Sequence, residues 1–306
     1  MDRLVECVPN FSEGRSAETV DALVAAVERE GATMLDREMD SSHHRCVLTF
    51  AGAPDVVASA AFAAVRAAIP RIDLNRHKGE HPRMGACDVV PFVPIAGVTI
   101  EEAVQLAESL GARIGGELGI PVYLYAEAAR RPDRRALPDV RKGEFEGLRD
   151  AIGKDPTKAP DFGPSQIHPT AGATAVGARF FLIAYNVQLE TADVDVAKEI
   201  AHAIRERDGG LPRVQAKGFE IEFAGKKLAQ VSMNLLDFRQ TSIARVYDEV
   251  EKRAKQRGVS VFDSELVGLV PRAALDDATA SRVRLRGYDP SKQVLEEVLL
   301  ARSVKR

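Results

Sequence analysis

Residues 32–50, which read ATMLDREMDSSHHRCVLTF, decide the fold. Two runs rich in β-forming residues, Ala32 to Met39 and His44 to Phe50, are separated by Asp40 to His43, and this spacing predicts a hairpin. On each side of the hairpin the pattern predicts a helix and a strand. These flanking elements are Leu4 to Val8 and Ala17 to Glu30 before the hairpin, and Pro54 to Ile69 and Val89 to Ile95 after it. The order of this region is therefore βαββαβ.

Two local signals refine the prediction for the segment that follows the hairpin. Pro91 and Pro94 indicate that the strand from Val89 to Ile95 is irregular or lies at a sheet edge, because proline cannot donate a ladder hydrogen bond. Thr99 and Glu102 have the spacing of a capping box, which predicts that a helix begins there.

The same order of elements returns in the second half of the chain. The predicted elements are a strand at Arg179 to Val187, a helix at Val194 to Arg207, strands at Val214 to Phe223 and Lys227 to Leu236, a helix at Ile243 to Gln256 and a strand at Val259 to Phe262. Two copies predict an α/β (α+β) protein with two ferredoxin-like βαββαβ subdomains, residues 1–177 and 178–306. The segment from Gly147 to Gly177 is then either the linker between them or a long functional loop.

Composition excludes several classes of protein. The 306 residues are 45% hydrophobic and 28% charged, as in ordinary globular proteins, and the net charge of −3 provides no basic field for nucleic acid. The three cysteines, Cys7, Cys46 and Cys87, lack CxxC spacing and lie in apolar surroundings, which indicates reduced thiols. We find no apolar run long enough for a signal peptide or a membrane span, and we therefore expect a cytoplasmic protein without a membrane partner.

The richest polar stretch is the loop from His77 to Asp88. Gly79 and Pro82 exclude a regular helix there, and Pro82 favours an extended backbone at His81. One interpretation is a metal site, although the two histidines are not on one helix face and a third ligand at a familiar spacing is missing. Another is acid–base chemistry by a loop histidine oriented by a carboxylate such as Asp40 or Glu80. A histidine on a mobile surface loop is the third.

A second unusual stretch, residues 161–179, is rich in glycine. Gly172 and Gly177 have the separation found in a phosphate-binding loop, but Ala178 and Arg179 stand where that loop has Lys and Ser or Thr. The glycines also precede a strand, whereas phosphate loops follow one. What remains is a flexible linker, or a loop whose bare backbone can approach a flat ligand closely. The chain has neither a GxSxG nucleophile elbow nor a GxGxxG after its first strand.

Five motifs together resemble a known family. They are LVECVPNFSEG at residues 4–14, RHKGEHPRMGACD at 76–88, PVYLYAEAA at 121–129, APDFGPS at 159–165 and LAQVSMNLLDF at 228–238. In this order they are similar to the glutamate formimidoyltransferase (formiminotransferase) family. The resemblance implies transfer of a formimidoyl group between 5-formimidoyltetrahydrofolate and L-glutamate, in histidine breakdown. It also implies a homodimer, a ligand cleft or tunnel between the two subdomains, and tetrahydrofolate as the carrier without a metal. Since the animal enzymes carry a cyclodeaminase domain after this region, we expect the monofunctional bacterial form.

The resemblance assigns roles to particular residues. His81 matches the catalytic histidine of the family, and Asp40 falls near its acidic site residue. The segment that matches the folate-binding stretch comprises Gly163, Pro164, Ser165, Gln166, Ile167, His168, Pro169, Thr170, Ala171 and Gly172. Gln166, His168 and Ala171 depart from the apolar or aromatic residues of the animal enzymes, so contacts to the pterin are expected to differ.

The chemistry of the transfer suggests how these residues act. The glutamate amine must lose a proton before it attacks the amidine carbon, and N5 of the folate must gain one as it leaves, so His81 can serve as general acid and base with Asp40 orienting it. Arginine suits the carboxylates of glutamate, and Arg45 and Arg83 are the nearest candidates. Three alternatives remain: transfer of a formyl group, a folate-binding protein without catalysis, and a metallohydrolase built on His43, His44, His77 and His81.

Overall fold

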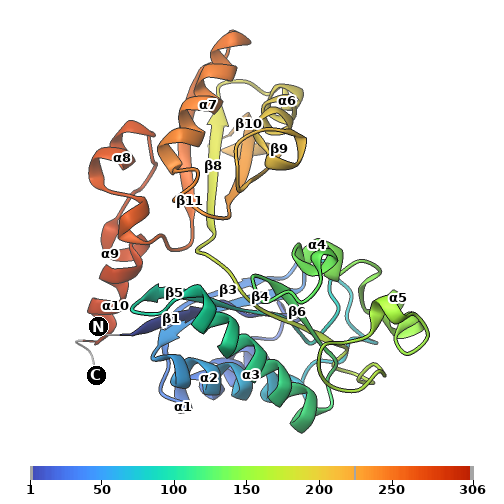
Figure 1. Ribbon diagram of the computed structural model, residues 1–306. Helices are drawn as coiled ribbons and strands as arrows, with labels where there is room; N and C mark the ends of the chain where they lie inside the picture. Colours follow the sequence, from blue (N-terminus) through green and yellow to red (C-terminus); the bar gives the residue numbers. More distant parts are fainter. Residues whose placement is uncertain (1–2, 224, 304–306) are drawn as a thin grey trace. The chain divides into compact units, whose positions relative to one another are not determined.

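The computed structural model describes residues 3–223 and 225–303 (Figure 1). By their contacts they divide into two compact units, Met1–Arg179 and Phe180–Arg306, and each is described by itself. The expected subdomain boundary between residues 177 and 178 falls inside the last strand of the first unit.

The first unit contains one mixed sheet and several helices. Its elements are β1 (Leu4–Cys7), β2 (Asn10–Phe11), α1 (Ala17–Arg29), β3 (Thr33–Asp40), β4 (Arg45–Gly52), α2 (Pro54–Ala68), β5 (Cys87–Ala96), α3 (Ile100–Leu118), β6 (Val122–Ala126), α4 (Leu137–Val140), α5 (Glu144–Ala151) and β7 (Thr174–Ala178). Across the sheet the order is β3, β4, then β1 and β2 end to end, then β5, β7 and β6. The part from β3 to β5 is antiparallel and has the ferredoxin-like order, so the predicted βαββαβ fold is confirmed for this unit.

One face of this sheet is covered by α1, α2 and α3 (Figure 1). Val5 and Cys7 point into this core, and strand alternation places Glu6 between them on the opposite face. The small residues of the Ala-rich α2 allow close packing, and Ala60, Ala64 and Ala68 are completely buried. The capping box predicted at Thr99 is present at the start of α3. All three cysteines are buried and free.

One interpretation of the Gly-rich segment and one of the two alternatives for β5 were wrong. The segment from Gly147 to Gly177 is not a linker, because Thr174–Ala178 is a buried strand that runs parallel to β5 on one side and β6 on the other. This pairing also places β5 inside the sheet instead of at its edge. The alternative prediction, an irregular strand, is confirmed by the register shifts in the pairing of β5 with β1 and β2. Pro91 is tolerated there because it lies opposite the break between β1 and β2, where ladder hydrogen bonds are interrupted anyway.

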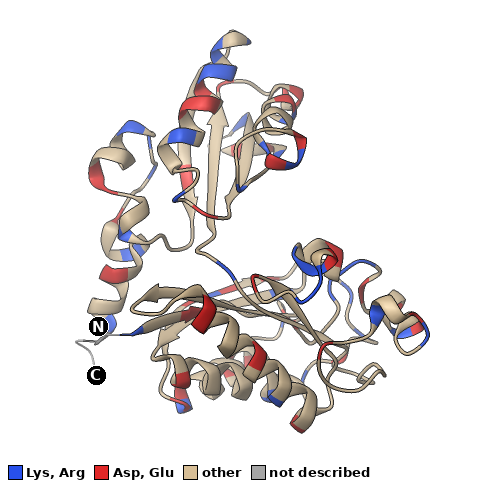
Figure 2. Ribbon diagram, viewed as in Figure 1, with Lys and Arg blue, Asp and Glu red and all other residues tan. Residues whose placement is uncertain are grey.

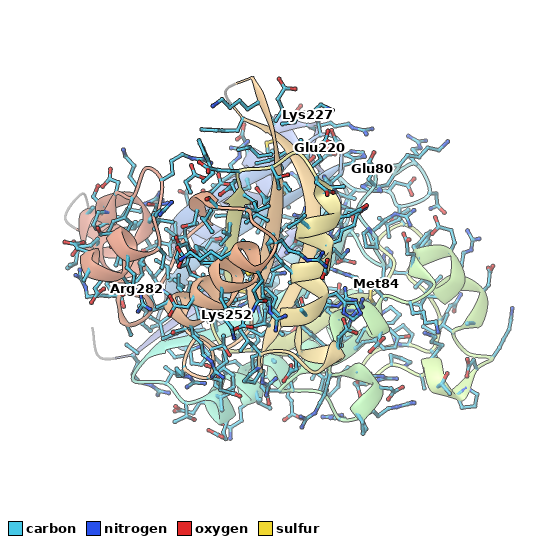
Figure 3. The ribbon with its side chains drawn as sticks, turned by 90° about the horizontal axis from the view of Figure 1, so that it is seen from above. Glu80, Met84, Glu220, Lys227, Lys252 and Arg282 are labelled. Carbon is cyan, nitrogen blue, oxygen red and sulfur yellow. The ribbon has the colours of Figure 1, made fainter. Side chains whose placement is uncertain are left out.

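The second unit repeats the fold. Its elements are β8 (Ile183–Leu189), α6 (Val194–Ile204), β9 (Val214–Phe223), β10 (Lys226–Leu235), α7 (Ile243–Gln256) and β11 (Val261–Val267), followed by α8 (Asp277–Arg282), α9 (Pro290–Gln293) and α10 (Leu295–Ser303). The strand order β11-β8-β10-β9, antiparallel throughout, is again ferredoxin-like, as predicted. On the β9–β10 hairpin, Glu220 and Lys227 form an ion pair of 2.8 Å across the strands (Figure 3).

Within the residues that the structure describes, no helix has the length and apolar character needed to cross a membrane.

Candidate active site

The loop from His77 to Asp88 connects α2 to β5 and packs on the turn between β3 and β4. Gly79 lies against the His43 carbonyl, and the backbone N–H of Glu80 donates to the Ser42 carbonyl at 3.4 Å. Glu80 and Met84 mark the two halves of this loop in Figure 3. The two sequence segments that carry four of the six histidines therefore meet in one place.

His77 and His44 are held in the framework of the site. Their rings stack with centroids 4.3 Å apart. The His77 Nε2–H donates to the His44 carbonyl at 2.7 Å, and its Nδ1 accepts from Arg83 at 3.3 Å, so both ring nitrogens are used. Burial lowers the pKa of His77, which keeps this ring neutral. A histidine with no free nitrogen cannot exchange protons with a substrate.

His44 is fixed by two acceptors. Its Nδ1 contacts the Lys78 carbonyl at 3.1 Å and its Nε2 contacts the Glu13 carboxylate at 3.3 Å. Burial alone would raise the pKa of Glu13. The pKa is nevertheless below its ordinary value, because the carboxylate accepts from the backbone N–H groups of Ser16 and Arg15 and lies near His44. Both ring nitrogens of His44 are therefore occupied by fixed partners.

His81 differs from these two residues because nothing holds its ring. It is half-buried, and within the described part of the chain its imidazole has no hydrogen-bond partner. Burial lowers the pKa of His81 to about 3, with smaller contributions from Arg141, Arg45, His43 and His77. The ring is therefore neutral near pH 7, with both nitrogens available to a ligand.

Asp40 contacts His43 and not His81, which it was expected to orient. Its carboxylate accepts from the backbone N–H groups of Ser42 and His43, each at 2.9 Å, and contacts the His43 Nδ1 at 2.7 Å. The His43 backbone and ring hold the pKa of Asp40 below its ordinary value, so this carboxylate is ionised. The histidine that Asp40 orients is His43.

The two arginines predicted to bind glutamate have different surroundings. Arg83 is buried and forms ion pairs with Glu144 at 3.1 Å and Glu146 at 2.6 Å. Arg45 forms no side-chain hydrogen bond or ion pair with any described residue, and it lines a cavity of about 320 Å³ together with Glu38, Met39, Asp40 and Val47. Only Arg45 is free to receive a carboxylate.

Arg141 is a charged neighbour of His81 that the sequence did not single out. It follows α4, in a region where positive and negative side chains are interspersed (Figure 2), and it lies near enough to His81 to oppose protonation of that ring. Its guanidinium pairs with the buried Asp88, whose other oxygen accepts from Met84 N–H at 2.7 Å. The Arg141 Nε is buried without a hydrogen-bond partner among the described residues. The sequence offered one signal for such a residue. Asp88 ends the polar loop, and a carboxylate that becomes buried there requires a cation as its partner.

The segment from Gly163 to Gly172 belongs to the same unit as His81. Its end is joined to the polar loop of residues 77–88: Gly172 pairs with Gly85, and Ala86 N–H donates to the Ala171 carbonyl at 2.9 Å. His168 closes a tight turn, since its Nδ1 accepts from Ala171 N–H at 3.0 Å. Residues 163–166 are exposed. The segment is thus a presented loop anchored beside the polar loop.

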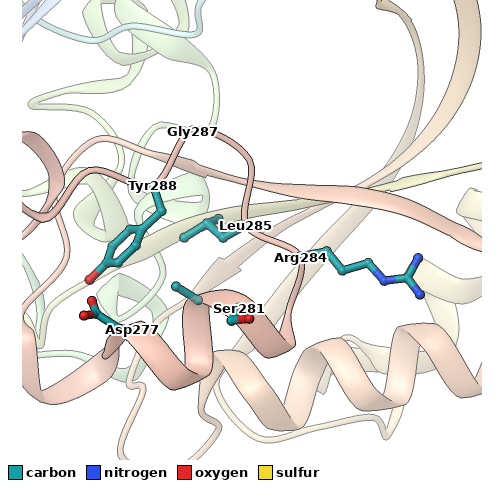
Figure 4. Close-up of a pocket in the computed structure, with 7 residues that line it drawn as sticks. Asp277, Ser281, Arg284, Leu285, Gly287 and Tyr288 are labelled. Atoms are coloured by element: carbon teal, nitrogen blue, oxygen red, sulfur yellow. The ribbon is translucent and has the colours of Figure 1, made fainter.

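Two further observations bear on the alternatives. No group of three or more His, Cys, Asp or Glu among the described residues is arranged to hold a metal ion. A hollow of about 460 Å³ in the second unit is lined by Asp277, Ala280, Ser281, Arg284, Leu285, Gly287 and Tyr288. In Figure 4 Tyr288 points towards Asp277, while Arg284 turns away, where its guanidinium donates to the Val261 carbonyl at 2.8 Å. None of the residues predicted from the sequence lines this hollow.

Comparison with known proteins gives consistent matches over both units. Residues 4–179 match the model of the N-terminal subdomain of the formiminotransferase domain, and residues 184–294 match the formiminotransferase domain model. The chain is 44% identical over 301 residues to glutamate formimidoyltransferase of Streptococcus pyogenes serotype M1, which covers 98% of this chain and 100% of that protein. It is 48% identical over 289 residues to the Thermoplasma acidophilum protein of the same name, with 94% of each covered. Formimidoyltransferase-cyclodeaminase of Sus scrofa is 48% identical over 287 residues, 92% of this chain and 52% of its own length.

Proposed function

The chain belongs to the formiminotransferase family, and from this we infer that it is a transferase that moves a formimidoyl group between 5-formimidoyltetrahydrofolate and L-glutamate. This is a step of histidine degradation. Full-length relatives that carry the name glutamate formimidoyltransferase are the observation on which the inference rests.

We propose that His81 exchanges protons with the substrates. Its ring is neutral and free of hydrogen bonds among the described residues, whereas the His77 ring in the same loop has no free nitrogen. In the transfer, the amine nitrogen of glutamate bonds to the amidine carbon and loses a proton, the bond from this carbon to N5 breaks, and N5 gains a proton. A neutral imidazole can accept the amine proton.

The cations around His81 also explain how binding of the acceptor can activate it. Arg45 and Arg141 disfavour a protonated His81 in the free protein. Glutamate brings carboxylates, and a carboxylate on Arg45 would neutralise part of this positive field. We propose that Arg45, in its cavity beside the β3–β4 turn, binds a glutamate carboxylate and so raises the basicity of His81 when the acceptor is present.

The remaining assignments are also proposals. The exposed loop of residues 163–166 and the turn from Ile167 to Gly172 are proposed to bind the folate, because they are anchored beside the loop that carries His81. We propose a cytoplasmic homodimer, with no metal needed for the transfer.

An assay of the purified protein tests the function. Release of tetrahydrofolate from 5-formimidoyltetrahydrofolate is followed with and without L-glutamate, and 5-formyltetrahydrofolate is offered as a second donor. We expect release that depends on both L-glutamate and the formimidoyl donor. Equal or faster turnover of the formyl donor would show that the protein transfers a formyl group, and binding of folate without release would show a folate-binding protein.

A further inference from the structure

The turn between β3 and β4 contains a second imidazole that is available for proton transfer. Asp40 fixes the orientation of His43 through the 2.7 Å contact to Nδ1, and it fixes the turn itself by accepting the backbone N–H groups of Ser42 and His43. Because a carboxylate only accepts hydrogen bonds, the proton of His43 resides on Nδ1 and Nε2 is left for exchange. The geometry matches the carboxylate–imidazole arrangement by which enzymes orient a proton-transfer group.

The histidines of the site thus fall into two pairs. His44 and His77 have both ring nitrogens engaged by Glu13, Arg83 and backbone carbonyls. His43 has only Nδ1 engaged by a described residue, and 46% of its side chain is exposed. Together with His81 it supplies two available imidazoles on loops that touch at Gly79.

These two imidazoles have different charged neighbours. His81 faces the cations Arg45 from β4 and Arg141 from the segment after α4, and also His43 and His77. The His43 ring contacts the ionised Asp40 from β3 and interacts electrostatically with His81, while Arg15 contacts the turn through the Ser41 carbonyl. Two imidazoles with different neighbours can divide the roles of acid and base between them.

We propose that His43, oriented by Asp40, is the second proton-transfer residue of the site and protonates N5 as the folate leaves. The proposal rests on the proposed formimidoyl transfer. His81 accepts a proton from the glutamate amine as the new C–N bond forms, and His43 Nε2 donates a proton to N5 as the C–N5 bond breaks. In each turnover His81 gains one proton and His43 loses one. Solvent then removes the proton from His81 and returns one to His43.

The first test compares His43→Asn with His202→Asn. His202 also lies near a carboxylate, with its Nε2 3.7 Å from Asp208, but it belongs to the second unit. We expect His43→Asn to lower kcat by roughly ten- to a hundredfold, in line with loss of a general acid, with the KM for L-glutamate changed less than about threefold. On the alkaline side, the pH profile of its kcat should also differ from that of the wild type, because the proposed proton donor to N5 is gone. His202→Asn should behave as the wild type.

A second variant separates this role from a purely structural one. Asp40→Asn keeps an oxygen for the turn N–H groups but removes the negative charge that contacts the His43 ring, so it should lower kcat and alter the same alkaline limb without a change in melting temperature. The double variant should be no slower than the slower single variant. A kcat and pH profile of folded His43→Asn equal to those of the wild type would overturn the inference and leave the proposed function intact. If His43→Asn does not fold, an unchanged alkaline limb in Asp40→Asn overturns it. Absence of glutamate-dependent release in the wild type would instead contradict the function.

Discussion

Gly79 is the residue at which the two histidine-bearing loops of the site make contact. A Cβ at this position would collide with the His43 carbonyl and lie 2.6 Å from the His44 Cβ, so the loops would have to separate. We expect Gly79→Ala to lower the free energy of unfolding by about 1–3 kcal/mol, as overpacking does, and to lower kcat because His81 moves relative to the turn. Denaturant unfolding and the tetrahydrofolate assay measure both effects.

The control for this change is Gly116→Ala. Gly116 lies in α3, and a Cβ there would meet no atom within 4 Å. Alanine in an exposed helix should therefore stabilise the protein by up to about 1 kcal/mol without an effect on kcat. If both variants behave alike, the contact at Gly79 is not what positions the loops.

Arg45 and Arg83 provide a second comparison at the residue scale. Arg45→Ala should raise the KM for L-glutamate by roughly ten- to a hundredfold, the loss of about 1.5–3 kcal/mol for a hydrogen bond to a charged group, while stability changes little. Arg83→Ala should instead leave the KM for L-glutamate nearly unchanged and lower the free energy of unfolding, because Arg83 is occupied by Glu144 and Glu146. These carboxylates are about half exposed, so we expect a stability loss of only about 1–2 kcal/mol. A higher KM for Arg83→Ala than for Arg45→Ala would reverse the assignment.

Glu6 gives a prediction about pH. It is only 2% exposed, and burial raises its pKa to about 7, with Arg179 opposing the shift. Because the ordinary pKa is 4.5, the folded chain binds more protons than the unfolded chain between these values, and the stabilisation present below pH 4.5 is lost as pH rises through 7. We expect Glu6→Gln to stabilise the protein relative to wild type by about 2–3 kcal/mol more at pH 8 than at pH 5, at about 1.36 kcal/mol per pKa unit. A difference that does not depend on pH would show that Glu6 is ionised in the folded protein throughout.

At the scale of elements, the start of α3 carries the capping box that the sequence predicted, and its contribution to stability can be measured. Thr99 accepts from Glu102 N–H at 3.2 Å, and Glu102 accepts from Thr99 N–H at 2.8 Å. Thr99→Ala should lower the free energy of unfolding by about 1 kcal/mol, whereas Thr99→Ser, which retains the cap, should have a smaller effect. Neither should change kcat. Thermal unfolding of the two variants side by side measures the contribution of the capping box.

Local patterns predicted most of the elements but not all of their neighbours. Amphipathic periodicity and turn residues indicated the βαββαβ order in both units, and the sheets have that order. The strand Thr174–Ala178 was missed because it is short, consists largely of small residues and follows a Gly-rich loop. Its partners Val89 and Tyr123 are more than 50 residues away, and parallel pairing over such separations leaves no local signal. The interior position of β5 was missed for the same reason.

The site shows the same division between local and long-range information. Gly79 and Pro82 were enough to place His81 on a loop. The contact of Asp40 with His43 and the occupation of Arg83 by Glu144 and Glu146 depend on turn geometry and on residues some 60 positions away. Arg141 was likewise visible only once its pairing with Asp88 joined two distant segments.

For the whole molecule, family membership covers both units and states which reaction to assay. The structure adds that the proposed base, its cations and the proposed folate loop all belong to the first unit. We therefore expect changes confined to the second unit, such as His202→Asn, to leave proton transfer unaffected.

The central claim is that His81 carries out the proton transfer, and turnover of His81→Ala tests it most directly. Tetrahydrofolate release from 5-formimidoyltetrahydrofolate is measured at saturating L-glutamate, together with the affinity for the folate. We predict that kcat falls by roughly a hundredfold or more, a typical loss for an acid–base residue, while folate affinity changes little. An unchanged kcat in a folded His81→Ala protein would contradict the account.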